Sequence, residues 1–551
     1  MPLRRIDNAH VLTLDRDRPA TARSIELRDG RIVSVAGTGA DAPPDDGSAR
    51  GSPSAAPPSR PIVCTGDVLD VGGRTVVPGF IDAHLHLLLG GLALSRLDLS
   101  GARSRAEFER LVAERHAALP EGAWLEGAGW SEENWAAKNE GGHDGRDGAL
   151  PDASWLRACG DRPAVLYRMD RHACLVNRAV LRRIDTRVDP RGGRIVRDAS
   201  GAPTGVLQEA AAWQLVDPLV PKPDLAGKRR ALAGACERLL RLGVTTAMSM
   251  ELAAEVRDVL EPVRRRLAPR VLVTLLDREW PLDLSFATRF ANDDRLRLLG
   301  CKAFIDGTLG SRTARMLEPY VDLAPGADPR RREDDGRGVL VELAERGVLL
   351  DWARMVVAAG LSPSMHAIGD EALRLALDVA DALPRDARVR IEHAQTAHPR
   401  DVARTRGRWL SMQPLHKADD GRDAQARLGA ERMDRFFPFR RYLDAGARLA
   451  FGSDWPIVSP DPLLGMRAAI TALTLDETVV GGDQALTPPE ALRAYTCDAA
   501  EMLGLRDVGA IRRGFAADLV VLSRDPFSAD WALDPPRVDA TIVAGELRHL
   551  T

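Results

Sequence analysis

The sequence predicts an α/β fold: a (β/α)8 TIM-like barrel with a small β-sandwich formed from both chain ends. Three observations predict it. Short apolar runs alternate with helical stretches from residue 79 onward, strand-like segments occur near both ends of the chain, and several apolar runs end in a histidine, lysine or aspartate. Alternating strands and helices are typical of a parallel sheet, and barrel active sites are built where the strands end.

The two chain ends read as β-structure. "SIELRDGRIVSV" alternates apolar and polar residues around Asp29-Gly30, which indicates a hairpin, and "ADLVVLSRDP" and "DATIVAGELRHL" are strand-like again. We therefore expect residues 1–77 and 508–551 to build the sandwich together, with residues 78–507 inserted as the barrel. Residues 38–60 are rich in Pro, Gly, Ser, Ala and Asp, which predicts a mobile surface loop.

The middle of the chain contains as many strand candidates as a barrel needs. They are residues 80–86, 244–250, 271–277, 299–305, 362–367, 388–393, 409–413 and 449–454. Two further apolar runs, 123–130 and 163–170, lie between the first and second candidates and make the count ambiguous. We assign residues 95–235 to an insertion after the first strand.

Composition excludes several kinds of partner. The 551 residues carry 76 basic and 79 acidic side chains, so the formal charge of −3 favours neither nucleic acid nor a membrane surface. No apolar run reaches the roughly 18 residues of a membrane span, and "MPLRRIDNAHVLTLD" lacks the apolar core of a signal peptide. The six cysteines form no CxxC pair, which predicts a reducing, cytoplasmic environment.

Two histidines in "IDAHLH" raise a question of chemistry. His84 and His86 are two residues apart, so they share one face of the first predicted strand. Alone, the pair is explained equally well by a metal site or by hydrogen-bonded core histidines. Other predicted strands also end in polar residues, which favours the metal site: Lys302 in "CKAFIDG", His366 in "SMHAIGD", His393 in "RIEHAQ" and Asp454 in "LAFGSDWP".

Lysine is rare in this chain. It occurs five times, against 71 arginines, so a lysine within an apolar run needs a reason specific to an amine. Guanidinium stays protonated, whereas an amine can be neutralised or modified. Lys302 meets this description; the alternative for it is a buried ion pair with Asp306.

The ordered motifs "VVPGFIDAHLH", "KAFIDGTLGSRTA", "HAIGD", "RIEHAQ", "FGSDWP" and "GAIRRGFAADLVVL", spanning residues 76–522, resemble the amidohydrolase superfamily. Within it they resemble the branch of N-substituted formamide deformylase and related metal-dependent hydrolases. The resemblance implies one or two divalent metals, usually zinc, at the barrel mouth. The implied ligands are His84, His86, Lys302, His366, His393 and Asp454, and Lys302 can be carboxylated to bridge two metals.

The resemblance implies a reaction as well. Metal-activated water attacks a carbonyl, and Asp454 takes the proton and returns it to the leaving nitrogen. We expect hydrolysis of a non-peptide carbon–nitrogen bond in an N-substituted amide or formamide. Alternatives are hydrolysis of cyclic amides or N-acyl amino acids, deamination, or a non-catalytic binding protein. A non-haem iron oxygenase would leave Lys302 and His393 unexplained.

Several residues are candidates for contacting substrate, each with core packing, turn packing or surface exposure as the alternative: Trp130, His172, Arg312, Gln413, His416 and Trp455. The second strand, "GVTTAMSM" followed by Glu251, departs from the His-Asp pair that the branch often has there. We expect its methionines to make the pocket tolerant of a bulky apolar group. The expected partner is a small amide-type molecule; neither nucleic acid nor membrane is expected, and a homodimer is left open.

Overall fold

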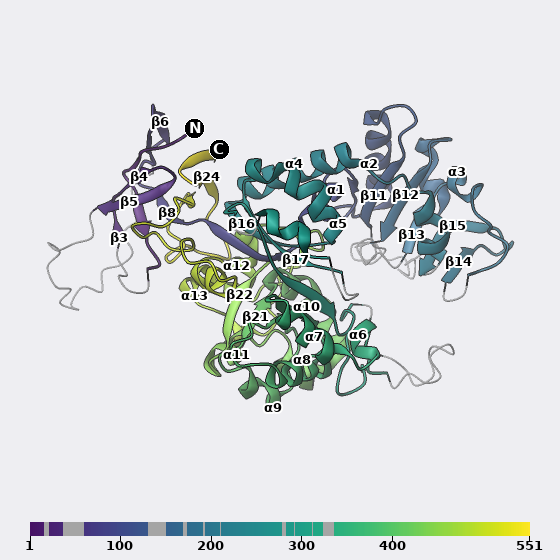
Figure 1. Cartoon of the computed structure of the whole chain (residues 1–551). Helices are drawn as coiled ribbons and strands as arrows, with labels where there is room; N and C mark the ends of the chain where they lie inside the picture. Colours follow the sequence, from purple (N-terminus) through teal and green to yellow (C-terminus); the bar gives the residue numbers. More distant parts are fainter. Residues whose placement is uncertain are drawn as a thin grey trace. The chain divides into compact units, whose positions relative to one another are not determined.

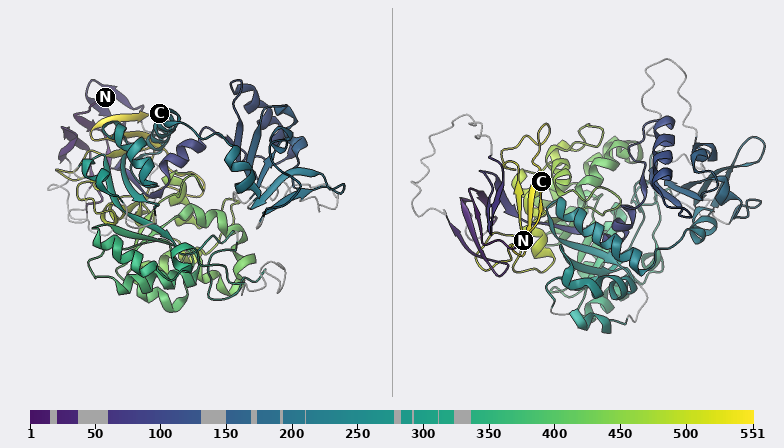
Figure 2. Two further views of the ribbon diagram at one scale, coloured as in Figure 1. Left: turned by 45° about the vertical axis from the view of Figure 1, so that its right-hand side comes forward. Right: turned by 90° about the horizontal axis from the view of Figure 1, so that it is seen from above.

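The computed structural model describes residues 1–15, 21–36, 60–130, 150–168, 173–190, 193–209, 211–277, 283–290, 293–310, 312–322 and 336–551. These form two compact units, residues 1–90 with 232–551, and residues 91–231. Of the expected loop at 38–60, only Arg60 is among the described residues. Figures 1 and 2 show both units.

An eight-stranded parallel sheet in the first unit confirms the predicted barrel. Its order is β22-β21-β20-β19-β18-β17-β16-β9. The strands are β9 (Phe80–Leu85), β16 (Val244–Glu251), β17 (Arg270–Leu275), β18 (Leu296–Phe304), β19 (Ser362–Ala367), β20 (Arg390–His393), β21 (Trp409–Met412) and β22 (Arg448–Phe451). Side chains along these strands are mostly buried, which explains their continuous apolar runs.

The sheet closes between β9 and the residues that follow β22. The Asp454 amide donates to the His84 carbonyl at 2.6 Å, and the His86 amide donates to the Trp455 carbonyl at 2.9 Å. A Cβ atom on Gly452 would lie 2.4 Å from the His84 nitrogen, so only glycine allows this approach. The closure brings the ends of the first and last barrel strands together.

Helices follow the barrel strands and cover the sheet (Figure 1). The main ones are α1 (Leu87–Ala93), α4 (Leu225–Arg241), α7 (Leu349–Ala358), α8 (Asp370–Ala382), α10 (Pro414–Leu428), α11 (Phe439–Asp444), α12 (Pro462–Thr471), α13 (Pro488–Ala494) and α14 (Cys497–Met502). Buried faces such as Leu373, Ala376 and Leu377 of α8 explain their spacing of three and four. Among the described residues, no helix is long and apolar enough to cross a membrane.

Two further sheets confirm the β-sandwich from both chain ends. One is ordered β5-β4-β1-β7-β6 and the other β25-β24-β23-β8-β2-β3. The Leu3 amide donates to the Gly545 carbonyl at 2.8 Å, so the termini lie side by side (Figure 1). The strands are β1 (Arg5–Asp7), β2 (His10–Leu12), β3 (Thr21–Ala22), β4 (Ser24–Arg28), β5 (Arg31–Ala36), β6 (Val63–Thr65), β7 (Val68–Asp70), β8 (Thr75–Pro78), β23 (Leu519–Leu522), β24 (Val538–Val543) and β25 (Glu546–Leu550).

The second unit, residues 91–231, starts and ends four residues before the insertion expected at 95–235. It has its own six-stranded mixed sheet, ordered β10-β11-β12-β13-β15-β14, and its own apolar clusters. The two apolar runs that obscured the strand count are β11 and β12 of this sheet. Its elements are β10 (Leu97–Asp98), α2 (Arg105–Ala118), β11 (Leu125–Trp130), β12 (Ala164–Arg168), β13 (Ala173–Val176), α3 (Arg178–Leu181), β14 (Gly193–Arg197) and β15 (Pro203–Glu209).

Candidate metal centre

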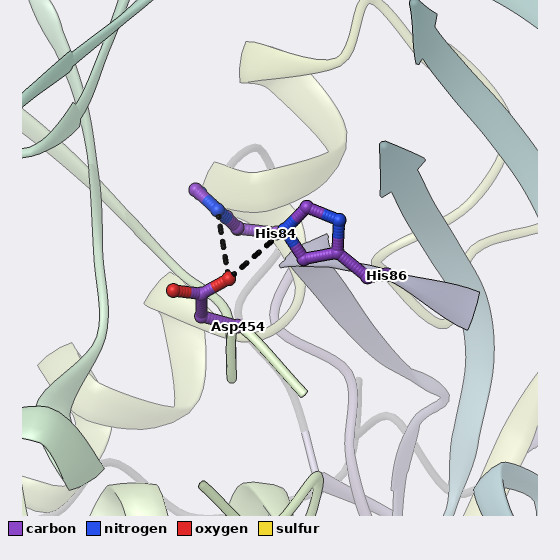
Figure 3. Close-up of side chains that lie close together, drawn as sticks. All are labelled: His84, His86 and Asp454. Atoms are coloured by element: carbon purple, nitrogen blue, oxygen red, sulfur yellow. Dashed lines mark ion pairs between the residues drawn. The ribbon is translucent and has the colours of Figure 1, made fainter. Parts of the chain in front are cut away.

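The two histidines of "IDAHLH" converge on one carboxylate (Figure 3). The Nε2 atoms of His84 and His86 each lie 3.3 Å from Asp454 Oδ1. His84 is fully buried, and the His86 side chain is mostly buried. Their Nδ1/Nε2 atoms and a carboxylate oxygen of Asp454 lie within 4.8 Å of one another, a spacing at which one metal ion could be held.

His84 is oriented by a second carboxylate, that of Glu392 on β20. His84 Nδ1 lies 2.7 Å from Glu392 Oε2, and because a carboxylate only accepts, this ring nitrogen donates. The donation leaves the lone pair on Nε2, which lies 3.2 Å from Lys302 Nζ and 3.3 Å from Asp454 Oδ1. Burial and the Lys302 charge oppose protonation of His84, but Asp454 and Glu392 outweigh them and raise its pKa. A carboxylate behind an imidazole is the usual support of a metal-binding histidine.

His393 is a buried histidine whose ring nitrogens lack hydrogen-bond partners. Neither Nδ1 nor Nε2 has a hydrogen-bond partner. Its ring centroid lies 4.9 Å from that of His84 and 4.5 Å from that of His366. Burial, together with the charges of His366 and His84, lowers its pKa well below the usual value, so the ring is neutral and able to ligate. Buried polar groups are rarely left unpaired, and a missing ion is one explanation.

His366 is positioned by Asp306, the residue considered as an ion-pair partner for Lys302. His366 Nδ1 lies 3.0 Å from Asp306 Oδ1. The same carboxylate accepts from the backbone amides of Arg315, Ile368 and Gly369. Asp306 thus fixes the loop after β18, and its support of His366 parallels the support that Glu392 gives to His84.

Lys302 reaches the histidine cluster. Its Nζ lies 3.2 Å from His84 Nε2 and 4.7 Å from the centroid of the Phe304 ring, and the side chain is 1% exposed. A protonated amine cannot ligate a metal. The structure places Lys302 beside His84, and its role there stays a prediction.

Asp454 belongs to both groups of possible metal ligands, one with His84 and His86 and the other with His393 and His416. Burial alone would raise its pKa, but His84 and His86 outweigh that effect and hold the pKa well below the usual value. Its backbone φ is +58°, and that of His393 is +69°. Residues other than glycine are strained in this region, and such strain is concentrated at functional sites. Asp454 is therefore an ionised carboxylate held at the meeting point of the first and last barrel strands.

His416, predicted as a candidate for contacting substrate, also belongs to the cluster. It lies at the start of α10, with Nε2 3.7 Å from Asp454 Oδ2, and its ring stacks on His393 at a centroid distance of 5.9 Å. One ligand atom each of His393, His416 and Asp454 lie within 4.8 Å of one another. In the sequence, His416 follows the predicted seventh strand, 409–413, by three residues. Because it lies in a helix, strand alternation does not show where its side chain points.

Asp82, the first acid of "IDAHLH", ties the two ends of the barrel sheet together. Its Oδ1 accepts from the backbone amides of His84 and Ser453 at 3.1 Å, and its Oδ2 accepts from Ser453 Oγ at 2.6 Å. Burial raises its pKa to about 6, against the lowering effect of these hydrogen bonds. Asp82 positions His84 and Asp454 without reaching the cluster itself.

Besides His416, three of the predicted substrate-contacting residues lie in the first unit. Gln413 is fully buried; its Nε2 donates to the Ser411 carbonyl and its Oε1 has no partner. The Trp455 ring packs so closely on α1 that a Cβ atom on Gly90 would lie 2.3 Å from it. Arg312 holds Asp322 through Nε at 3.0 Å from each oxygen, so its charge is already paired. Contact of these residues with substrate stays a prediction.

Two predicted candidates fall elsewhere. Trp130 is fully buried in an apolar cluster of the second unit, and its indole donates to the Leu166 carbonyl at 2.7 Å. This environment favours the core-packing alternative, and its contact with substrate also stays a prediction. His172 lies outside the described residues.

The expectation of a methionine-lined pocket was wrong. Met248 and Met250 are buried in an apolar cluster with Ile81, Leu272 and residues of α14, so they offer no surface to a ligand. The end of β16 carries polar side chains instead. Glu251 Oε1 accepts from Ser249 Oγ at 2.7 Å and from the Leu88 amide at 3.0 Å, and burial raises its pKa to about 7.

The barrel, the sandwich and the imidazole–carboxylate cluster together define a class of barrel hydrolases. Consistent with this, the profile described as the amidohydrolase family matches residues 67–549. The chain belongs to the amidohydrolase family and is an enzyme of that kind.

The chain is similar to known proteins along most of its length, and one solved structure shares its fold. The chain is 31% identical to Protein LONG AFTER FAR-RED 3 of Arabidopsis thaliana, over 98% of this chain and 90% of the relative. It is 28% identical to N-substituted formamide deformylase of Arthrobacter pascens, over 99% and 98%. An uncharacterized metal-dependent hydrolase from Pyrococcus horikoshii OT3 shares the fold, with a TM-score of 0.70 and 24% identity over 96% of this chain and 99% of that one.

Proposed function

We propose that this enzyme is a metal-dependent hydrolase that cleaves the carbon–nitrogen bond of an N-substituted amide or formamide. The observation that carries the metal is His393, a buried neutral imidazole with two unpartnered nitrogens. The substrate class rests on the motifs and on likeness to the Arthrobacter deformylase along nearly the whole of both chains.

The donor set fits zinc. Imidazole nitrogens and carboxylate oxygens are its usual ligands, together with thiolates. The residues that would hold one or two ions are His84, His86, Lys302, His366, His393 and Asp454, with His416 as a further donor. A bound divalent ion supplies Lewis-acid chemistry there, because it polarises a carbonyl and lowers the pKa of water.

Asp454 is suited to move the proton. Its pKa is held low, so it is ionised at neutral pH and can accept a proton from water that attacks the substrate carbonyl. The same oxygen can then return the proton to the leaving nitrogen, which breaks the carbon–nitrogen bond. His416 Nε2, 3.7 Å from Asp454 Oδ2, is placed to orient this carboxylate or to donate to a bound carbonyl.

Lys302 is proposed to act in carboxylated form. Addition of CO2 to the neutral amine forms a nitrogen–carbon bond, releases a proton and leaves an anionic two-oxygen ligand. Its Nζ lies 3.2 Å from His84 Nε2, so an oxygen ligand formed on it would lie beside the imidazoles. An arginine could not react in this way, which is a reason for a lysine here in a chain that otherwise prefers arginine.

A turnover panel tests the proposed function. Purified full-length enzyme is incubated with N-alkyl and N-aryl formamides, N-acyl amino acids, cyclic amides and aminated heterocycles, and release of formate, amine or ammonia is measured. We expect formamide hydrolysis that a chelator abolishes and zinc restores. Turnover confined to another substrate class would overturn the formamide assignment, and turnover unaffected by the chelator would overturn the metal-dependent reaction.

A further inference from the structure

A second site for a charged ligand lies at the amino-terminal end of the barrel strands. A cavity of about 500 Å³ opens there. It is lined by the starts of β18, β19 and β20 and by the chain after α14, including Arg297, Ser362, Arg388, Arg390, Arg506 and Asp507. Ligand sites typically occupy about 300–1,000 Å³, so this cavity is large enough for a small organic molecule.

The cavity has an excess of positive charge. Four arginines and one aspartate line it. The aspartate, Asp507, is already paired with Arg31, whose Nη1 lies 3.1 Å from Asp507 Oδ2. Within the described part of the chain, no ion pair or side-chain hydrogen bond is found for Arg297, Arg388 or Arg506. These three arginines therefore make no ion pair with any residue that the structure describes.

Arg390 adds a buried guanidinium whose hydrogen bonds the protein meets only in part. The residue is 3% exposed, its Nη2 donates to Thr274 Oγ1, and its Nε and Nη1 have no hydrogen-bond partner. Arg390 Nε forms an ion pair with Glu392 Oε1 at 3.6 Å, without a hydrogen bond, and that carboxylate also bonds His84 and Ser364. A buried guanidinium with two free nitrogens is costly unless an acceptor meets it.

A neighbouring cavity shows what a structural arginine looks like in this fold. It has a volume of about 440 Å³ and is lined by Asp29, Asp293, Asp294 and Asp507 as well as by arginines. There, Arg270 Nε donates to Asp518 Oδ2 at 2.8 Å, and its Nη1 donates to Asp294 Oδ2 at 3.2 Å. That buried arginine is hydrogen-bonded to two acids, whereas Arg390 has one ion pair, with Glu392, and two nitrogens without a hydrogen bond.

We propose that the cavity lined by Arg297, Arg388, Arg390 and Arg506 binds a small polyvalent oxyanion, a phosphate ester or a polycarboxylate. Guanidinium groups bind carboxylate and phosphate through paired hydrogen bonds. Four guanidinium groups, beside one aspartate that is already paired with Arg31, suit a ligand with two or more negative charges. The site lies at the end of the barrel opposite the histidine cluster, so it is separate from the metal centre.

Calorimetry on the full-length protein tests the site. Inorganic phosphate, a sugar phosphate and malonate are titrated against chloride at matched ionic strength, and competition among them distinguishes a phosphate from a carboxylate ligand. We expect saturable binding of at least one probe. Replacing the exposed Arg388 and Arg506 by glutamine should weaken it by at least about tenfold. Arg265→Gln, an exposed arginine outside the cavity, should leave binding unchanged.

The metal centre could also bind these anions, so each titration is repeated after metal removal. Binding in the cavity persists without metal and is lost in the Arg388→Gln/Arg506→Gln variant. Binding lost with the metal and retained in that variant overturns the proposal, and so does the absence of saturable binding by all three probes. An unchanged melting temperature shows that the variant is folded.

Discussion

The two ends of the barrel strands carry groups that suit ligands of opposite charge. At their carboxyl ends, β18, β19 and β20 carry Lys302, His366 and His393, beside a carboxylate. At their amino ends β18 and β20 carry Arg297 and Arg390. Imidazole and carboxylate suit a cation, whereas guanidinium suits an anion. We therefore expect the barrel strands to support a cation at their carboxyl ends and an anion at their amino ends.

The largest expected effect tests whether the carboxyl ends of the barrel strands form the active site. Asp454→Asn keeps the shape of the side chain but removes the proton acceptor. We expect kcat for the best substrate of the panel to fall by about a thousandfold. Assays of product formation at saturating substrate measure this fall in kcat. The exposed Asp386→Asn serves as the control, and activity of Asp454→Asn within a few-fold of the wild type would contradict the role of Asp454.

Glu251, at the carboxyl end of β16, tests whether a buried charge there lowers the stability of the fold. Its pKa is raised from 4.5 to about 7, so the folded protein prefers the protonated form. Its carboxylate destabilises the fold fully above pH 7, and this cost disappears as the pH falls below 4.5. Glu251→Gln should therefore gain about 2–3 kcal/mol in free energy of unfolding, relative to the wild type, between pH 5 and pH 8.

Urea unfolding of both proteins at the two pH values measures the change at Glu251. The exposed Glu431→Gln variant should show no such gain. A stability difference between Glu251→Gln and the wild type that is independent of pH would show that Glu251 is charged without cost.

Glu392 lies between the two ends, because it faces His84 on one side and Arg390 on the other. Glu392→Gln keeps the volume but weakens the support of His84. We expect metal affinity to fall by about 10–100-fold, as is common when such a partner is lost. Titration with a zinc-buffered chelator measures it. An unchanged affinity would mean that His84 does not need its carboxylate to bind the metal.

Much of the fold could be predicted from local sequence. The barrel strands were found as apolar runs, and the paired chain ends were found by their strand patterns. The extent of the second unit was harder to derive, since β11 and β12 have the same apolar character as barrel strands although they belong to another sheet. Periodicity shows that a strand exists, but its neighbours depend on the rest of the chain.

In the site, too, some residues could be predicted from local sequence, and others depend on tertiary contacts. His84, His366, His393 and Asp454 share a visible signal, a polar residue at the end of an apolar run. Glu392 carries no such signal, because its partner His84 is 308 positions away in the sequence. The methionines of β16 were misplaced for a related reason: composition showed them to be apolar, but only packing shows that they face a filled cluster.

Metal content tests the central claim most directly. Full-length protein is loaded with zinc, freed of excess by gel filtration and analysed by mass spectrometry, beside His393→Ala and the control His549→Ala from the distant strand β25. The account predicts one or two zinc ions per chain in the wild type and in His549→Ala, and clear loss in His393→Ala. A wild-type protein without bound metal, or full metal content in His393→Ala, would contradict it.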